Sequence, residues 1–110
     1  MEIIAHDYPH AAVIRVIGRV DAGTYPALEN KINEFINAGQ KHLVLELDAV
    51  EYLSSAGVRV LISTQKTLKG RGGRLAISQP SERVTDVLQL AGVDVLFPTY
   101  PTTVAALATE

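Results

Sequence analysis

The chain has 110 residues, which is enough for one domain with a single hydrophobic core. Its composition, with 47% apolar and 20% charged residues and a net charge of −2, excludes intrinsic disorder and the basic stripe that nucleic acid binding requires. Cysteine is absent, which excludes disulfides, thiol catalysis and Cys-ligated metals and favours a cytoplasmic location. No apolar run approaches the roughly 20 residues needed to cross a bilayer, so we expect no membrane partner.

The sequence opens with two short segments rich in Ile and Val, residues 2–7 and 11–18. Tyr8, Pro9 and His10 separate them, and a proline in such a short connection is typical of a turn. We therefore predict an N-terminal β-hairpin.

Two kinds of segment alternate in the rest of the chain. The predicted strands are apolar runs, and they cover residues 43–47, 74–78 and, at the far edge, 95–97. The predicted helices carry a core-facing stripe at helical spacing, formed by Leu28, Ile32, Phe35 and Ile36; by Val58, Leu61, Ile62, Gln65 and Leu68; by Val84, Val87, Leu88 and Ala91; and by Val104, Ala105, Leu107 and Ala108. Gly39 and Gly92 stand where the first and third helices are expected to end.

Strands that alternate with helices favour right-handed crossovers and parallel pairing, and the opening hairpin adds an antiparallel edge. The sequence therefore predicts a single α/β domain over residues 1–110. Its sheet should be mixed and mostly parallel, with about four to five strands, an N-terminal antiparallel hairpin and helices packed on it.

Two adjacent serines, Ser54 and Ser55, stand where the second predicted helix begins. A hydroxyl at this place can cap backbone N–H groups that have no partner within the helix. A phosphate on the same residue would lie at the positive end of the helix dipole. The serine pair therefore fits both a structural cap and a phosphorylation switch.

The three histidines, His6, His10 and His42, do not have the spacing of a metal-ligand set and are expected to be exposed. Composition alone does not exclude a Ser–His–Asp arrangement, but Ser54 and Ser55 lack the G-x-S-x-G pattern of a nucleophile elbow. We therefore predict no catalytic residues and no enzyme activity. A hydrolase with a serine nucleophile is the least favoured alternative.

The acidic and glycine-rich segments fit no cofactor or metal site. Glu46, Asp48 and Glu51 lie near a strand end, where alternate faces would separate their carboxylates. Glycines 70, 72 and 73 follow a helix and precede a strand, whereas a phosphate-binding loop has the reverse order. We expect neither a cofactor nor a metal.

The segment LVLELDAVEYLSSAGVRVL, residues 43–61, resembles the STAS domains of the small stand-alone anti-sigma factor antagonists of bacteria. In that family a strand leads to a D-S-S/A/T-G-L motif and a helix. Ser55 falls on the phosphorylatable serine of the motif, and Ser54 stands where the family commonly has Asp. Ala56, Gly57 and Val58 follow in step.

Two further segments match the family in the same order, so the resemblance covers nearly the whole chain. GRVDAGT, residues 18–24, is similar to the family's G-E/R-L/V-D segment and places Asp21 in a loop near the phosphoserine site. GGRLAISQPSERVTDVLQLAGVDVLF, residues 72–97, resembles the family's later strand and helix pattern.

The resemblance implies a partner-switching mechanism. Such a protein binds an anti-sigma factor that is also a serine kinase of the GHKL type, and phosphorylation of the serine dissociates the complex. A PP2C-type phosphatase restores the binding form. Ser55 is the expected phosphoacceptor and Ser54 the second choice. Because Ser54 replaces the usual Asp, a STAS subunit that is not phosphorylated, in a lipid-transport or other regulatory complex, is the alternative.

The expected partner-binding residues lie on the first loop and at the helix start. They are Asp21, Ala22, Gly23, Thr24, Ser54, Ser55, Ala56, Gly57, Val58 and Arg59. Several of them are small, which would leave the backbone open to close approach by a partner. We expect the free chain to be a monomer.

Overall fold

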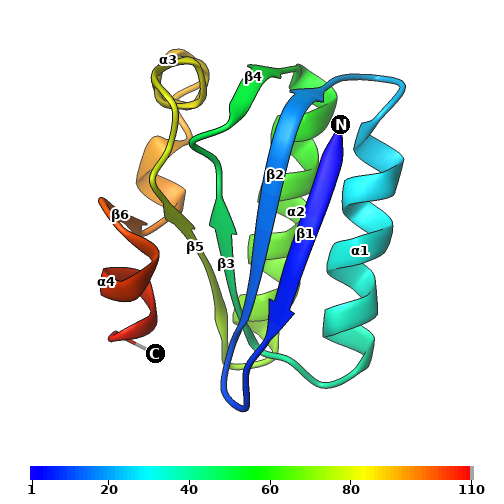
Figure 1. Ribbon diagram of the computed structural model, residues 1–110, viewed down its shortest axis with the longest axis vertical. Helices are drawn as coiled ribbons and strands as arrows, with labels where there is room; N and C mark the ends of the chain where they lie inside the picture. The colour runs from blue at the N-terminus through cyan, green and yellow to red at the C-terminus, as the bar shows by residue number, and fades with distance from the viewer. Residues whose placement is uncertain (110) are drawn as a thin grey trace.

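One sheet of six strands, ordered β1-β2-β3-β5-β6 with β4 beside β2, forms the centre of the molecule (Figure 1). The computed structural model describes residues 1–109. The strands are β1 Glu2–Asp7, β2 Ala12–Val20, β3 His42–Glu46, β4 Val50–Leu53, β5 Arg74–Ser78 and β6 Thr99–Tyr100. Only β1 and β2 pair in antiparallel fashion within these residues, which confirms the mixed, mostly parallel sheet and the N-terminal hairpin.

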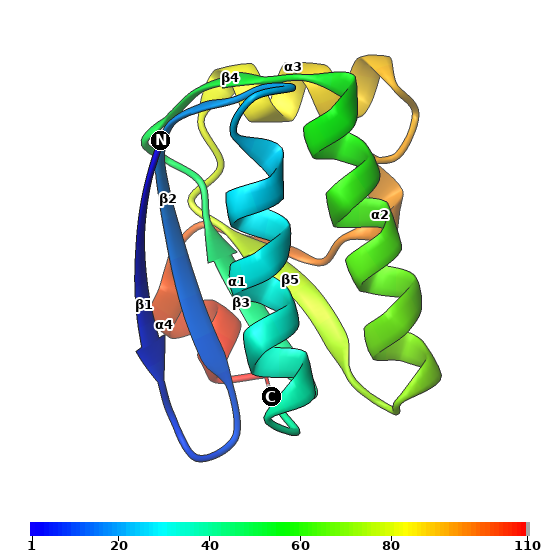
Figure 2. The same ribbon diagram turned by 90° about the vertical axis from the view of Figure 1, so that its right-hand side faces the viewer.

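Helices cover both faces of this sheet. They are α1 Tyr25–Asn37, α2 Ser55–Gly70, α3 Glu82–Leu90 and α4 Thr103–Leu107, with a 3₁₀ turn, η1, at Asp94–Leu96. Figure 2 shows α1 and α2 side by side on one face, whereas α4 lies on the other. The helix ends predicted at Gly39 and Gly92 are confirmed, and both glycines have a positive φ, 95° and 71°.

The two faces carry separate apolar clusters, because successive strand residues point to opposite sides. From β2, Ile14 and Val16 enter the main core under α1 and α2. Val13, which directly precedes Ile14 and so points to the opposite face, instead joins Val44 and Ala106 in a smaller cluster under α4. In α4 the buried residue is Ala106, and Leu107 of the predicted stripe packs against the same cluster. Val104 of that stripe is 78% exposed, so the stripe is only partly right.

The prediction of four to five strands included none at residues 50–53, where the structure has β4. β2 has nine residues, but β3 pairs only with its first four, Ala12–Arg15. β4 pairs in parallel with the end of β2, from Gly18 to Val20, and so continues the ladder. This pairing joins segments about 30 residues apart in the chain, so local sequence patterns did not predict it.

The strand predicted at residues 95–97 is wrong. Val95 is 83% exposed and Leu96 39% exposed, and η1 occupies these positions instead. Phe97 alone is buried there, so the segment lacks the two-residue repeat of side chains that a strand needs for packing. The true edge strand, β6, follows Pro98, whose carbonyl accepts a hydrogen bond from the Ile77 N–H at 2.9 Å.

Candidate functional site

The ends of β2 and β4 and the start of α2 meet at one end of the sheet, at the top of Figure 1. The backbone N–H of Ser54 donates to the carbonyl of Val20 at 2.8 Å. This bond joins the residue before Asp21 to the residue before Ser55, so the two predicted loops lie side by side. We call the exposed part of this region, formed by residues 19, 21–24, 55 and 59, the switch surface.

The structure gives the two serines different positions. Ser54 has extended backbone angles, φ −83° and ψ 170°, and its Oγ accepts a hydrogen bond from the Gly57 N–H at 3.2 Å. It is therefore the N-cap of α2 and is half-buried. Ser55 is the first residue of this 16-residue helix, and its side chain is exposed.

The replacement Ser54→Ala is expected to lower the free energy of unfolding by about 1 kcal/mol, because the Gly57 N–H loses its capping acceptor. Ser55→Ala, the matched control, should change the stability by less than about 0.5 kcal/mol, since an exposed side chain is removed. Urea unfolding followed by circular dichroism measures both values. Equal losses for the two variants would contradict the assignment of Ser54 as the cap.

Asp21 closes a tight turn between β2 and α1. Its Oδ1 accepts hydrogen bonds from the backbone N–H groups of Gly23 at 3.0 Å and Thr24 at 3.1 Å. In return, the Asp21 N–H donates to the Thr24 hydroxyl oxygen at 2.8 Å. The bond from Gly23, followed by those from Thr24, lowers the pKa of Asp21 below its usual 3.8. The carboxylate is therefore charged at neutral pH.

The lowered pKa of Asp21 predicts a pH-dependent contribution to stability. A carboxylate whose pKa is lower in the folded state stabilises that state above its unfolded pKa, and the contribution disappears as the pH falls through the folded pKa. Asp21→Asn should therefore be less stable than the unaltered chain at pH 7, and the difference should shrink below about pH 4. Urea unfolding at a series of pH values tests this. A difference that does not depend on pH would contradict it.

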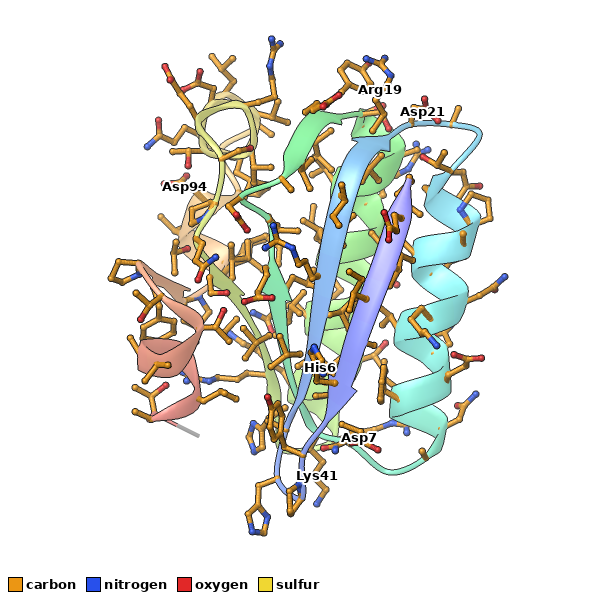
Figure 3. The ribbon with its side chains drawn as sticks, viewed as in Figure 1. His6, Asp7, Arg19, Asp21, Lys41 and Asp94 are labelled. Carbon is orange, nitrogen blue, oxygen red and sulfur yellow. The ribbon has the colours of Figure 1, made fainter. Side chains whose placement is uncertain are left out.

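Arg19, a residue of the switch surface, stacks on Tyr52, and the sequence did not predict this contact. The Arg19 guanidinium lies 4.3 Å from the centre of the Tyr52 ring, and its Nε lies 3.7 Å from Asp21 Oδ2 (Arg19 and Asp21 are labelled in Figure 3). The Arg19 side chain is still 59% exposed. The two residues are opposite each other in the β2–β4 pair, so the contact depends on a strand that the sequence did not predict.

Three of the predicted contact residues, Ala56, Gly57 and Val58, are buried and do not present side chains to a partner. A Cβ atom on Gly57 would lie 2.6 Å from Leu53 Cδ1 and 2.8 Å from Val20 Cγ1. The small size of Ala56 and Gly57 allows the first turn of α2 to pack against the ends of the strands. The expectation that small residues here leave the backbone open to a partner is therefore wrong.

The other predicted contact residues remain at the surface or at its margin. Ala22, Gly23 and Arg59 are exposed, and Thr24 is half-buried beside Asp21. Together with Ser55 they form a continuous rim around the start of α2 and the loop after β2.

The histidines lie far from the serines. His6 pairs with Val13 and His42 begins β3, so both lie near the start of β2, whereas Ser54 contacts its last residue, Val20. The seven residue-to-residue steps from Val13 to Val20 span about 23 Å of strand. This separation excludes a Ser–His pair in this conformation. His6 is exposed as predicted, but His42 is half-buried.

The acidic residues near β3 also have separate structural roles. Asp48 accepts from Arg15 Nη1 at 2.7 Å, and Glu46 accepts a hydrogen bond from the Thr103 hydroxyl. Partial burial acts to raise the pKa of Asp48, but the bond and charge of Arg15 outweigh it and lower the pKa. Glu51 is exposed. Within residues 1–109, no three His, Asp or Glu side chains come together as a potential metal site.

None of the helices within residues 1–109 is both long and apolar enough to cross a bilayer.

Comparison with known proteins agrees with this geometry. An antagonist called BtrV, described as a putative anti-sigma factor antagonist of Bordetella bronchiseptica, is 30% identical over 83% of this chain and 78% of its own. The crystal structure of an anti-sigma factor antagonist from Mycobacterium paratuberculosis superposes with a TM-score of 0.87 at 31% identity, covering 98% of this chain and 92% of that one.

The fold is also that of the antagonist SpoIIAA, solved in unphosphorylated and phosphorylated forms. Both forms are 20% identical to this chain and cover 98% of it, with TM-scores of 0.85 and 0.78 and coverage of 95% and 98% of their own chains. The profile of the STAS domain family matches residues 2–106. The chain therefore belongs to the STAS domain family.

Proposed function

We propose that this chain is an anti-sigma factor antagonist whose switch surface binds an anti-sigma factor with serine kinase activity of the GHKL type. Phosphorylation of Ser55 releases the partner, and a PP2C-type phosphatase restores binding. Relatives named as anti-sigma factor antagonists support the partner class. The observation that carries the switch is the exposed Ser55 at the first position of α2, beside the half-buried cap Ser54.

Phosphorylation at this position is compatible with the fold. A phosphoserine carries about −1.5 to −2 charges at neutral pH. On Ser55 this charge would lie at the positive end of the α2 dipole, which stabilises it by roughly 0.3 to 2 kcal/mol. The free domain therefore keeps its structure, and the effect falls on the complex.

The complex loses stability because the phosphate adds charge to a surface that already holds the ionised Asp21. A partner that fits the unphosphorylated surface would have to desolvate the new dianion without a matching cation, which is expensive. The switch therefore acts through the electrostatics of an interface and requires no refolding of the backbone.

Arg19 and Tyr52 provide an anchor at the rim of the same surface. Arginine and tyrosine are enriched among the residues that dominate binding energy at protein interfaces. The Tyr52 ring below and Asp21 beside it hold the Arg19 guanidinium in one place, which lowers the entropy that the side chain loses on binding. We expect an acidic group of the partner to contact Arg19.

The proposal is tested by incubating the chain with ATP and a GHKL-type kinase whose gene lies next to its own. Intact mass measurement and peptide mapping then show whether and where phosphate is added. The expected result is a gain of one phosphate, about 80 Da, on Ser55. Ser55→Ala should abolish the gain, whereas Ser54→Ala should retain it. A stable complex without phosphate transfer would overturn the switch and favour the binding subunit that is not phosphorylated.

A further inference from the structure

Strand β1 leaves one long edge of the sheet without a partner. The sheet order ends at β1, which pairs with β2 on one side only among the described strands, and Figure 2 shows it along the outer border of the molecule. The opposite edge strand, β6, has two residues, whereas β1 has six. The β1 sequence EIIAHD contains neither Pro nor Lys, residues that commonly protect such edges from pairing.

The hairpin geometry determines which backbone groups of β1 point outward. The Tyr8 N–H donates to the Ala11 carbonyl at 2.9 Å and closes the turn. Bonded and non-bonded pairs alternate along an antiparallel ladder, so the N–H and C=O groups of Ile3, Ala5 and Asp7 point away from β2. A second strand can pair with this edge only if residues whose backbone N–H and C=O groups also point outward stand opposite Ile3, Ala5 and Asp7.

The side chains on the outer face of β1 are Glu2, Ile4 and His6, since Ile3 and Ala5 pack against the main core. Ile4 is 40% exposed, although it is a large apolar side chain in the middle of a strand. An acidic residue stands two positions before Ile4, and a histidine stands two positions after it.

We propose that β1 pairs in antiparallel fashion with β1 of a second copy of this chain, with Ile4 opposite Ile4 at the two-fold axis. In this register Glu2 of each copy stands opposite His6 of the other, and Ile3 stands opposite Ala5. The outward backbone groups of Ile3 and Ala5 then bond to each other. The pairing thus sets polar side chains opposite polar ones and apolar opposite apolar, and it satisfies the outward backbone hydrogen bonds.

No other nearby register combines these features. A shift of one residue would set outward-pointing backbone groups opposite inward-pointing ones and break the ladder. A shift of two residues in either direction would place Ile4 opposite Glu2 or His6, so that an apolar side chain faces a polar one.

The dimer leaves the proposed switch available in both copies. Glu2 pairs with Ile17, so the start of β1 lies at the same end of the sheet as the switch surface. Because the two β1 strands run in opposite directions, the two switch surfaces lie at opposite ends of the dimer. This proposal replaces the monomer expected from the sequence and does not depend on phosphorylation of Ser55.

Single cysteines test the register, because the chain has no cysteine of its own. Non-bonded antiparallel pairs have Cα atoms about 4.5 Å apart, within the range that a disulfide can bridge. Under mild oxidation Ile4→Cys should form disulfide dimers at least about 10 times faster than His6→Cys, whose two copies would stand about 13 Å apart along the strands. A mixture of Glu2→Cys and His6→Cys should give the mixed disulfide. Equal rates for Ile4→Cys and His6→Cys would overturn the proposal.

Sedimentation velocity of the unaltered chain gives an independent readout. The sedimentation coefficient should rise toward that of a dimer between about 10 μM and about 1 mM, the range in which a weak interface associates. Ile4→Lys should remove this rise, and Val104→Lys, which changes an apolar residue of α4 that is 78% exposed, should preserve it. A chain that stays monomeric over the whole range would contradict the dimer.

Discussion

Ser55→Asp is expected to weaken binding to the anti-sigma factor by about 30-fold, or ~2 kcal/mol, whereas Ser55→Ala should keep the affinity within about threefold. The carboxylate places a charge inside the proposed interface, on the same surface as the ionised Asp21, and its desolvation is not compensated by the partner. The alanine removes only an exposed hydroxyl. Isothermal titration calorimetry with the purified kinase measures both affinities.

Two controls separate this effect from damage to the fold. Ser63→Asp introduces the same charge at an exposed position two turns further along α2 and should weaken binding by less than about threefold. Ser55→Asp itself should unfold at the same or a slightly higher temperature, because the new charge lies at the positive end of the helix. Equal affinity of Ser55→Asp and Ser55→Ala would exclude the charge mechanism.

Gly73→Ala is expected to destabilise the fold by about 3 kcal/mol or more, the largest effect predicted for a single methyl group in this chain. A Cβ on Gly73 would overlap the carbonyl oxygen of Lys41, which is backbone and has no freedom to rotate away. That carbonyl also accepts from the Arg74 N–H at 2.9 Å and so aligns β5 with β3. Urea unfolding with the midpoint and slope fitted together gives the free energy change.

Two neighbouring glycines provide matched controls for Gly73→Ala. A Cβ on Gly72 would meet nothing within 4 Å, but this residue has a φ of 81°, so Gly72→Ala should cost only about 1 kcal/mol. Gly70 ends α2 with open space around it, and Gly70→Ala should be neutral or stabilising by up to about 1 kcal/mol. A loss for Gly73→Ala no larger than that for Gly72→Ala would show that the backbone at Lys41 can move.

Local sequence patterns were sufficient to predict most of the helices and the serine pair at the start of α2. The stripe from Leu28 to Ile36 predicted α1, because a helix that packs on a sheet must bury one face. The serine pair predicted the start of α2, because a hydroxyl at that place satisfies a backbone N–H that the helix leaves without an acceptor. Each of these signals depends on residues within a few positions of one another.

Features that depend on distant segments were not predictable in the same way. β4 forms only because β2 extends beyond β3 and needs a further partner, and the stacking of Arg19 on Tyr52 exists only once β4 is in place. Likewise, Ala56 and Gly57 looked like open backbone for a partner, but both are buried, and Gly57 packs against Val20 and Leu53 from two different strands.

The amino-acid pattern alone was thus enough to predict the α/β class and the antiparallel hairpin, and the resemblance to the STAS family added Ser55 as the candidate phosphoacceptor. Only the tertiary structure decided that Ser54 is half-buried, that Arg19 joins the switch surface and that β1 is a bare edge. The physical reason is that capping and amphipathic periodicity act over one or two turns of chain. Burial and strand neighbours depend instead on which distant segments pack together.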